Sequence, residues 1–406
     1  MRLRRALIGL LVLCTAAAAA AQEPAPAAPP AEDTRTQFPA VMRDSYVTLR
    51  GGWIGYLFTA RQLEPGFEAE SIEKPRPAVR LDFFGHQFTK NFGVQVTYMR
   101  PGQFVEYNNI NGPNGSHPVS NAYAGLTFVA DAALSQKVSA YVEGGYGVTS
   151  RSGIVIDGKV ALQPAHYGSA LVGLGFAYQL TPTFDLLLGA TYSPGRQSFD
   201  QPSTRMYTFG TRINMRRIPA ADVITNRDAG YIFPANVVRV GYSTNKLTYG
   251  VNGLFSKYVV IFWGGHVETK QGATIEYERN VFHSKKRFAF DLGVSTSAWQ
   301  SNGTLTTFRT LSAYPLVRYF FGRTQPADVY FSYSIAGPTF ISQYLLDGLN
   351  TGARFTFQDS MGIGVFIGKA RHMNVDVSIK HFSNGNLATE NAGIKIPLTF
   401  KVGLAF

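Results

Sequence analysis

Apolar and polar residues alternate with a period of two along most of this chain, a pattern typical of β-strands that have one apolar and one polar face. The last run is the clearest, because apolar residues occupy every second position from Ile394 to the terminal Phe406. After the first 21 residues, no stretch approaches the roughly 20 consecutive apolar residues of a membrane-spanning helix. The pattern therefore predicts an all-β fold.

The first half of the chain contains about eight alternating runs, and the connections between them alternate in length. The expected strands are about 46–56, 78–88, 92–100, 121–133, 137–149, 166–180, 183–193 and 205–215. Tight connections at 89–91, 135–136 and 181–182 are separated by long ones rich in Gly, Pro, Asn and charge, such as 57–77 and 101–120. Short turns at one end and long loops at the other are typical of outer-membrane barrels.

The second half predicts a further set of eight strands. They run at about 258–269, 273–282, 287–299, 308–321, 327–341, 353–367, 373–383 and 394–406. Residues 216–235 contain Pro219, Asn226, Asp228 and Pro234 and are interpreted as a linker, which an even strand number leaves on the periplasmic side. The stretch 236–254 is ambiguous between an extra hairpin and linker, with 247–252 the weaker strand candidate. The fold class is thus two consecutive antiparallel transmembrane β-barrels at 45–215 and 236–406; one larger barrel is the alternative.

The N-terminal residues predict export. Arg2, Arg4 and Arg5 precede a short apolar run and an alanine run, so residues 1–21 are interpreted as a cleaved signal peptide and 22–44 as a Pro/Ala-rich linker. The single cysteine, Cys14, lies in that signal, which leaves no disulfide framework. The chain contains 21 Tyr, 30 Phe and 41 Gly without a spanning helix, which favours a location in the outer membrane of a Gram-negative cell.

The net charge bears on the partners of an exported protein. The formal charge is +12, and anionic outer-membrane lipid is a more natural partner for such a protein than nucleic acid, which we do not expect it to bind. The sequence is compatible with a homo-oligomer. It is also compatible with a non-enzymatic barrel that serves adhesion, envelope integrity or narrow passage of solutes.

One strand carries candidate chemistry at its end. In residues 374–384, Val375, Val377 and Ile379 share a face with His381 and Ser383, while the even-numbered Asn374–Lys380 positions share the other. An imidazole and a hydroxyl two residues apart on one face can form a general base and nucleophile. The alternative is a pair of ordinary polar residues where a strand leaves its apolar environment.

The residues around this pair resemble a known family. His381-Phe382-Ser383-Asn384, followed by Asn391-Ala392-Gly393 and a final strand, resembles the lipid A 3-O-deacylase (PagL) family, an acyloxyacyl hydrolase type. The preceding strand, with Phe357-Gln358-Asp359, Gly362 and Gly364, fits the same family, and the resemblance covers about residues 258–406. The terminal Phe406 resembles the assembly signal of such barrels, and the N-terminal half resembles OmpA-like barrels in strand style only.

The resemblance implies an outer-membrane serine esterase that removes a 3-O-linked acyl chain from the lipid A of lipopolysaccharide. It implies Ser383 as nucleophile, His381 as base and Asn384 as oxyanion donor, with no metal or cofactor. The family has a Glu two residues after the Gly of Asn-x-Gly, whereas this chain has Lys395 there. Glu390 is the predicted substitute acid; a Ser–His dyad and an inactive relative are the alternatives.

The strand count also predicts where the pair lies. Counted back from a periplasmic C-terminus, the strand at 373–383 climbs outward, which places His381 and Ser383 at the level of the outer leaflet. Since the apolar face of a barrel strand faces lipid, the pair is expected to point out of the barrel. For Asp359, the family resemblance implies a structural contact inside the lumen.

Overall fold

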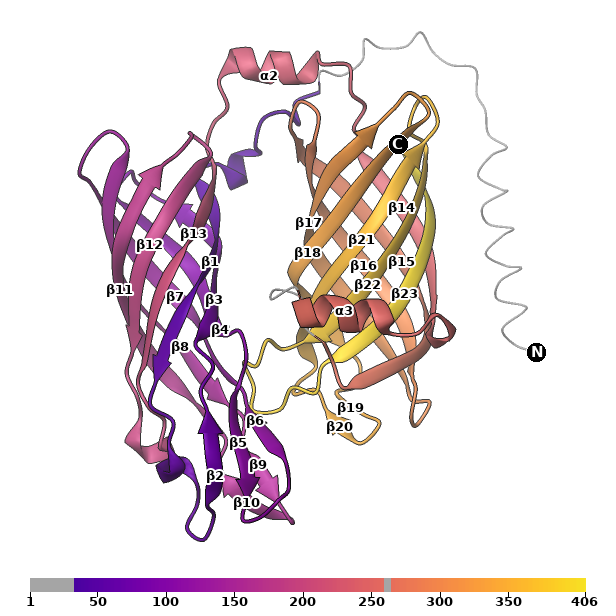
Figure 1. The fold of residues 1–406 in the computed structure, drawn as a ribbon. Coiled ribbons are helices and arrows are strands. Elements are labelled where there is room, and N and C mark those ends of the chain that lie inside the picture. The colour runs from indigo at the N-terminus through magenta and orange to yellow at the C-terminus, as the bar shows by residue number, and fades with distance from the viewer. Residues whose placement is uncertain (1–32, 259–263) are drawn as a thin grey trace. The chain divides into compact units, whose positions relative to one another are not determined.

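The computed structural model describes residues 33–258 and 264–406, and these form two closed antiparallel barrels of eight strands each (Figure 1). Two barrels were predicted, and the single larger barrel is wrong. The predicted signal peptide at 1–21 and residues 22–32 of the predicted linker at 22–44 lie outside the described residues. None of the described helices is both long and apolar enough to cross a membrane.

The first barrel follows the predicted strands closely. Its strands are β1 (Ser45–Tyr56), β3 (Pro77–Gln87), β4 (Phe92–Pro101), β7 (Asn121–Ala133), β8 (Val138–Arg151), β11 (Ala165–Gln179), β12 (Phe184–Ser193) and β13 (Thr204–Met215). Consecutive strands pair, and β1 closes the ring by pairing with both β3 and β13. Large apolar side chains such as Phe128 and Leu188 are exposed on its outer face, as a lipid-facing surface requires.

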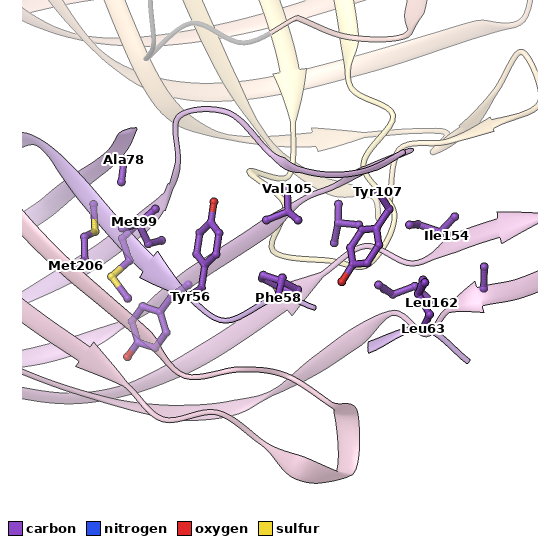
Figure 2. Close-up of a cluster of buried hydrophobic side chains, with 14 of the residues drawn as sticks. Tyr56, Phe58, Leu63, Ala78, Met99, Val105, Tyr107, Ile154, Leu162 and Met206 are labelled. Carbon is purple, nitrogen blue, oxygen red and sulfur yellow. The ribbon is translucent and has the colours of Figure 1, made fainter. Parts of the chain in front are cut away.

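The long connections of this barrel fold into a cap with its own core. They contain β2 (Ala69–Glu73), β5 (Val105–Ile110) and β6 (Ser116–Val119) in one sheet, the hairpin of β9 (Ile154–Ile156) and β10 (Lys159–Leu162), and the turns η2 (Ala60–Gln62) and η3 (Gln197–Phe199). Figure 2 shows Phe58, Tyr107 and Leu162 among the buried apolar side chains that gather there. The loops are therefore ordered by apolar burial.

The interior of the first barrel is filled with charged side chains. Arg80 lies 3.0 Å from Asp82 and 2.5 Å from Glu143, and Arg50 pairs with Asp82. A cavity among Tyr46, Arg50, Glu143 and their neighbours measures about 10 Å³, roughly the room for one water molecule. This packing is that of a small barrel filled by its own side chains and does not resemble an open channel.

The second barrel is built from eight strands in chain order. They are β14 (Asn236–Thr244), β15 (Val267–His283), β16 (Phe288–Ser301), β17 (Thr307–Arg323), β18 (Ala327–Ile341), β21 (Phe355–Ile367), β22 (Met373–Ser383) and β23 (Ile394–Ala405). Its longer connections hold η4 (Asn245–Leu247), α3 (Gly250–Tyr258) and the hairpin of β19 (Leu345–Leu346) and β20 (Leu349–Asn350). The turn η1 (Ala40–Met42) precedes the first barrel, and α2 (Ala220–Arg227) lies in the predicted linker 216–235.

The start of this barrel differs from the prediction. The expected strand at 258–269 is wrong, because residues 264–266 lie in no strand and 267–269 belong to β15; residues 259–263 lie outside the described part. The ambiguous stretch 236–254 instead provides β14 and the start of α3. The weak strand at 247–252 is also wrong, since Val251, Leu254 and Phe255 recur at helical rather than alternating spacing.

The last strand contains a bulge that reverses its faces. Ser378 pairs with Thr399 but Lys380 pairs with Ile396, so one residue of β22 opposes both Pro397 and Leu398 of β23. The extra residue therefore lies on the strand of Pro397 itself. Beyond it, Ile394 and Ile396 are buried with Phe382 and Trp299, whereas Phe400, Val402 and Leu404 are exposed outward.

The lumen of the second barrel is held together by buried ion pairs around Glu276. Its carboxylate lies 2.6 Å from Lys380 Nζ, 3.2 Å from Lys401 Nζ and 3.4 Å from Arg239 Nε. All four side chains are almost fully buried. The barrel interior therefore depends on charges that compensate one another.

Replacement of Glu276 by Gln is expected to lower the free energy of unfolding by about 3–5 kcal/mol, because it leaves buried cations uncompensated. Glu268→Gln is the matched control: it breaks a half-exposed pair with Lys395 and should cost at most about 1 kcal/mol. Urea unfolding in detergent micelles measures both values. Equal destabilisation by the two variants would contradict the role assigned to the Glu276 cluster.

Candidate active site

The strand β22 presents the two predicted site residues on its outer face. Its inward residues include Lys380, which binds Glu276 in the lumen, so the flanking Ile379 and His381 point outward. Ser383 follows His381 on the same face, at the last residue of the strand. The structure thus has the predicted arrangement in β22: polar residues face the lumen, and His381 and Ser383 face outward.

The neighbouring strand β21 brings a carboxylate to the imidazole. Asp359 is the direct cross-strand partner of His381, as Phe357 is of Ser383. Asp359 Oδ2 lies 3.6 Å from His381 Nδ1, within ion-pair range but longer than a hydrogen bond, and both side chains are at most 3% exposed. The prediction that Asp359 is a lumen contact is wrong, since it shares the outer face with His381.

The position of Asp359 is fixed by the adjacent strand. Its Oδ1 accepts a hydrogen bond of 2.8 Å from the backbone N–H of Ala336, a residue with φ of +53° beside a register shift in β18. This irregular backbone turns a donor toward the carboxylate. Asp359 therefore has one oxygen anchored to β18 and the other directed to His381.

Glu390, the predicted acid, lies apart from this arrangement. Its side chain is exposed, and its carboxylate forms no ion pair with any residue in 33–258 or 264–406. Its backbone oxygen accepts a hydrogen bond of 2.7 Å from Asn384 Nδ2. The acid at the imidazole is Asp359, and a catalytic role for Glu390 stays a prediction.

Asn384, the predicted oxyanion donor, organises the loop between β22 and β23. Its Nδ2 donates to the backbone oxygens of Thr351 and Glu390, at 3.2 and 2.7 Å. Its backbone N–H donates to Asn391 Oδ1 at 3.0 Å, and Asn391 in turn donates to Asn386. Both kinds of donor on Asn384 are thus engaged, and an oxyanion role requires at least one of them to change partner.

Glycine is required where this loop returns to the barrel. Gly393, the Gly of the Asn-x-Gly motif, has φ of +63°, and a Cβ there would lie 3.1 Å from His381 Nε2 and 3.2 Å from Gly265 Cα. The backbone N–H of Val267 also donates to the Gly393 oxygen. Gly393 therefore lets two chain segments close over the imidazole.

The helix α3 covers the outer face just below the site. Val251 and Phe255 pack against Met361 and Ile379, and Asn252 Nδ2 donates to the Ile396 oxygen at 2.9 Å. His381 and Ser383 are only 1% and 6% exposed, and no hydrogen bond joins these two described residues. The two side chains therefore lie buried on one face of β22 without a direct hydrogen bond between them.

Lys395 lies beside His381 on the other flanking strand, where it is the cross-strand partner of His381. Its Nζ lies 3.1 Å from Glu268 Oε1 and 5.4 Å from the ring centre of Tyr249. The bulge at Pro397 and Leu398 puts Lys395 on the outer face. A cation and a carboxylate therefore flank the imidazole on opposite sides.

The loop between β18 and β21 is anchored by Asp347. Its carboxylate accepts hydrogen bonds from Ser301 Oγ at 2.6 Å and from the backbone N–H groups of Gly303 and Thr304 at 2.9 and 2.7 Å. Partial burial raises the pKa of Asp347, but these hydrogen bonds outweigh it and lower the pKa to about 2. The charged form thus holds the loop of residues 302–306 in place.

This shift predicts a pH-dependent loop. Because the folded pKa is lowered, the stabilisation is present above the ordinary pKa of about 3.9 and is lost as the pH falls toward 2. Protection of the Gly303 and Thr304 amides against hydrogen exchange, relative to the intrinsic rate at each pH, should fall over that range, and in Asp347→Asn it should be low already at pH 5. Asp157→Asn, in an exposed turn of the first barrel, serves as the control. Unchanged protection of the two amides in Asp347→Asn would contradict the role of the Asp347 carboxylate in holding this loop.

Together these features define a class of protein: an outer-membrane β-barrel whose wall carries an outward-facing Ser–His pair with a carboxylate beside the imidazole. Residues 271–398 match the profile of the family "Lipid A 3-O-deacylase (PagL)". The second barrel is therefore a lipid A deacylase-like outer-membrane β-barrel. Among curated protein sequences, none matches this chain.

Among solved structures, several outer-membrane barrel proteins are similar to this chain. The outer membrane enzyme PagL gives a TM-score of 0.31 at 16% identity over 42% of this chain and 100% of that chain. Neisserial surface protein A (NspA) gives 0.30 at 14% over 42% and 97%, and the N-terminal barrel of Pseudomonas aeruginosa OprF gives 0.27 at 14% over 42% and 97%. At these scores the similarities carry no argument about activity.

Proposed function

We propose that the barrel at 236–406 is an outer-membrane serine esterase that removes a 3-O-linked acyl chain from the lipid A of lipopolysaccharide. The observation that supports this most is the outward-facing arrangement of Ser383, His381 and Asp359 in a barrel that matches the deacylase profile. An ester group of an outer-leaflet lipid could reach this face without entering the lumen. On this proposal, residues 1–21 direct export, 22–44 and 216–235 are linkers, and 45–215 forms a separate barrel domain.

The chemistry follows from the residue types. The Ser383 oxygen attacks the ester carbonyl while His381 accepts its proton; His381 then protonates the departing sugar oxygen, leaving an acyl group on Ser383. Water, activated by His381, releases a 3-hydroxy fatty acid and restores the Ser383 hydroxyl. The products are that fatty acid and 3-O-deacylated lipid A.

Asp359 takes the role of the orienting acid in this proposal. It is 3.6 Å from His381 Nδ1, so a small closure would give the hydrogen bond that fixes the imidazole tautomer and stabilises the imidazolium. The site then keeps an acid although Lys395 occupies the family's Glu position on β23, because Asp359 supplies the carboxylate from β21, on the other side of β22. Glu390 is the competing assignment.

Stabilisation of the oxyanion requires a rearrangement. Asn384 is the proposed donor, and its Nδ2 must leave the Thr351 or Glu390 oxygen to reach a tetrahedral intermediate. Access to the buried pair likewise requires movement of the segments that close over it. If binding of an outer-leaflet lipid moves the segments that cover Ser383 and His381, the same movement would also free Asn384 Nδ2 for the oxyanion.

The test is release of 3-hydroxy fatty acid from purified lipopolysaccharide by the full chain in detergent, measured by mass spectrometry. Release that depends on Ser383 supports the proposal. The second candidate function is a non-enzymatic outer-membrane protein with a degenerate deacylase barrel. Lys395 in the acid position and the absence of a Ser383–His381 hydrogen bond favour that alternative, and an unchanged acyl pattern would select it.

A further inference from the structure

Lys395 lies over Tyr249 beside the Ser–His pair, and Lys246 and Lys270 lie on the adjoining chain segments. We call Lys246, Tyr249, Glu268, Lys270 and Lys395 the Tyr249 patch. Lys395 stands over the Tyr249 ring and pairs with Glu268, and the Tyr249 hydroxyl donates to the Thr269 oxygen. Thr244 pairs with Gln271 across β14 and β15, which brings the backbone before Lys246 next to that after Lys270. The patch therefore forms from β15, β23 and the segment that follows β14, which contains η4.

The charge of the patch is positive on balance. Lys246, Lys270 and Lys395 carry three positive charges, against two carboxylates: Glu268, which pairs with Lys395, and the nearby Asp347, which is held by Ser301, Gly303 and Thr304. Lys246 is exposed and Lys270 is half-buried at the surface. An anion with several oxygens would therefore find more positive than negative partners here.

The ion pair of Lys395 with Glu268 is not a structural necessity. Its side chains are 25% and 37% exposed, and pairs in such positions contribute little to stability. Exchange of the Glu268 carboxylate for a ligand oxygen would thus cost little. A lysine ammonium binds phosphate as a point charge without strict geometry.

The patch also lies at the right place for a substrate group. Lys395 and His381 are direct cross-strand partners, so their Cβ atoms are about 5 Å apart. A ligand whose ester carbonyl reaches Ser383 would carry the remainder of its polar head past His381 and over Lys395. An anionic group on that head would then meet the three lysines.

We propose that Lys395, assisted by Lys246 and Lys270, binds a phosphate of a phosphorylated glycolipid whose ester is presented to Ser383. This rests on the proposed function for the ester, but the binding itself does not require turnover. It gives the departure at position 395 a physical reason: the residue on this flank of His381 binds the substrate, while Asp359 supplies the acid from the other flank.

Binding is measured with the full chain carrying Ser383→Ala, in detergent, by native mass spectrometry against lipid A with two phosphates and against the same lipid after dephosphorylation. Lys395→Met in this background should weaken binding of the phosphorylated lipid about 10- to 100-fold, the value of one or two charged hydrogen bonds. Binding of the dephosphorylated lipid should be unchanged. Lys395→Arg should restore most of the affinity, and Lys285→Met, in an exposed turn at the opposite end of the barrel, should have no effect.

Equal losses for the two lipids, or no loss for either, would overturn the proposal. Equal Lys395-dependent binding of phosphatidylglycerol vesicles would also overturn it, because the patch would then bind any anionic lipid. Lys395-dependent binding by a chain that releases no fatty acid would support the phosphate site and remove the esterase. Fatty acid release by the unaltered chain, together with unchanged lipid binding in Lys395→Met, would support the esterase and remove the phosphate site.

Discussion

Replacement of Ser383 by alanine is expected to lower fatty acid release by on the order of 10⁴- to 10⁶-fold, the loss that removal of a serine nucleophile causes in other hydrolases. His381→Ala should have a similar effect, since nucleophile and base act as one unit. Ser378→Ala is the matched control, because Ser378 lies on the same strand but faces the lumen. That variant should keep its activity.

The measurement is release of 3-hydroxy fatty acid from lipopolysaccharide at equal amounts of folded protein, with folding verified by urea unfolding. Activity that survives both Ser383→Ala and His381→Ala would remove this pair from the mechanism. Loss of activity in Ser378→Ala with intact folding would show that the assay reports barrel integrity and not site chemistry.

The second large effect concerns the orienting acid. Asp359→Asn should lower kcat by roughly 10²- to 10⁴-fold, because the imidazole loses the charge that stabilises its protonated form, while an oxygen remains to accept from Ala336. Glu390→Gln should leave kcat nearly unchanged, since its exposed carboxylate forms no recorded ion pair. The two variants are compared by steady-state kinetics on a purified lipid A substrate.

The reverse outcome would reassign the acid. A large loss in Glu390→Gln with little change in Asp359→Asn would mean that the loop closes further when substrate binds and brings Glu390 to His381. Little change in either variant would leave a Ser–His dyad. Each result separates one of the three arrangements that the sequence allows.

The barrel architecture could be predicted because period-two alternation and loop length are local properties. Strands such as β7 and β22 were located closely from their alternation alone. The start of the second barrel could not be predicted in this way, because Val251 and Phe255 acquire their apolar surroundings by packing on residues of other strands, such as Met361 and Ile379. A short amphipathic helix beside a barrel is set by tertiary packing that a local pattern does not contain.

The candidate site was predictable only in part for a similar reason. His381 and Ser383 share a face by alternation within one strand, whereas the contact of His381 with Asp359 depends on the register of β21 against β22. Counting back across the short turn at 368–372 is the signal that could have found it. The bulge at Pro397 is harder still to predict from the sequence. It reverses which residues of β23 face lipid and determines where Lys395 points.

The central claim, that this barrel deacylates lipid A, is tested most directly in a host whose own lipid A keeps its 3-O-linked acyl chain. Lipid A is extracted from cells that express the full chain or its Ser383→Ala variant and is analysed by mass spectrometry. The account predicts a lipid A species lighter by one 3-hydroxyacyl group with the unaltered chain and none with Ser383→Ala. An identical acyl pattern from both, with both proteins folded in the outer membrane, would contradict it.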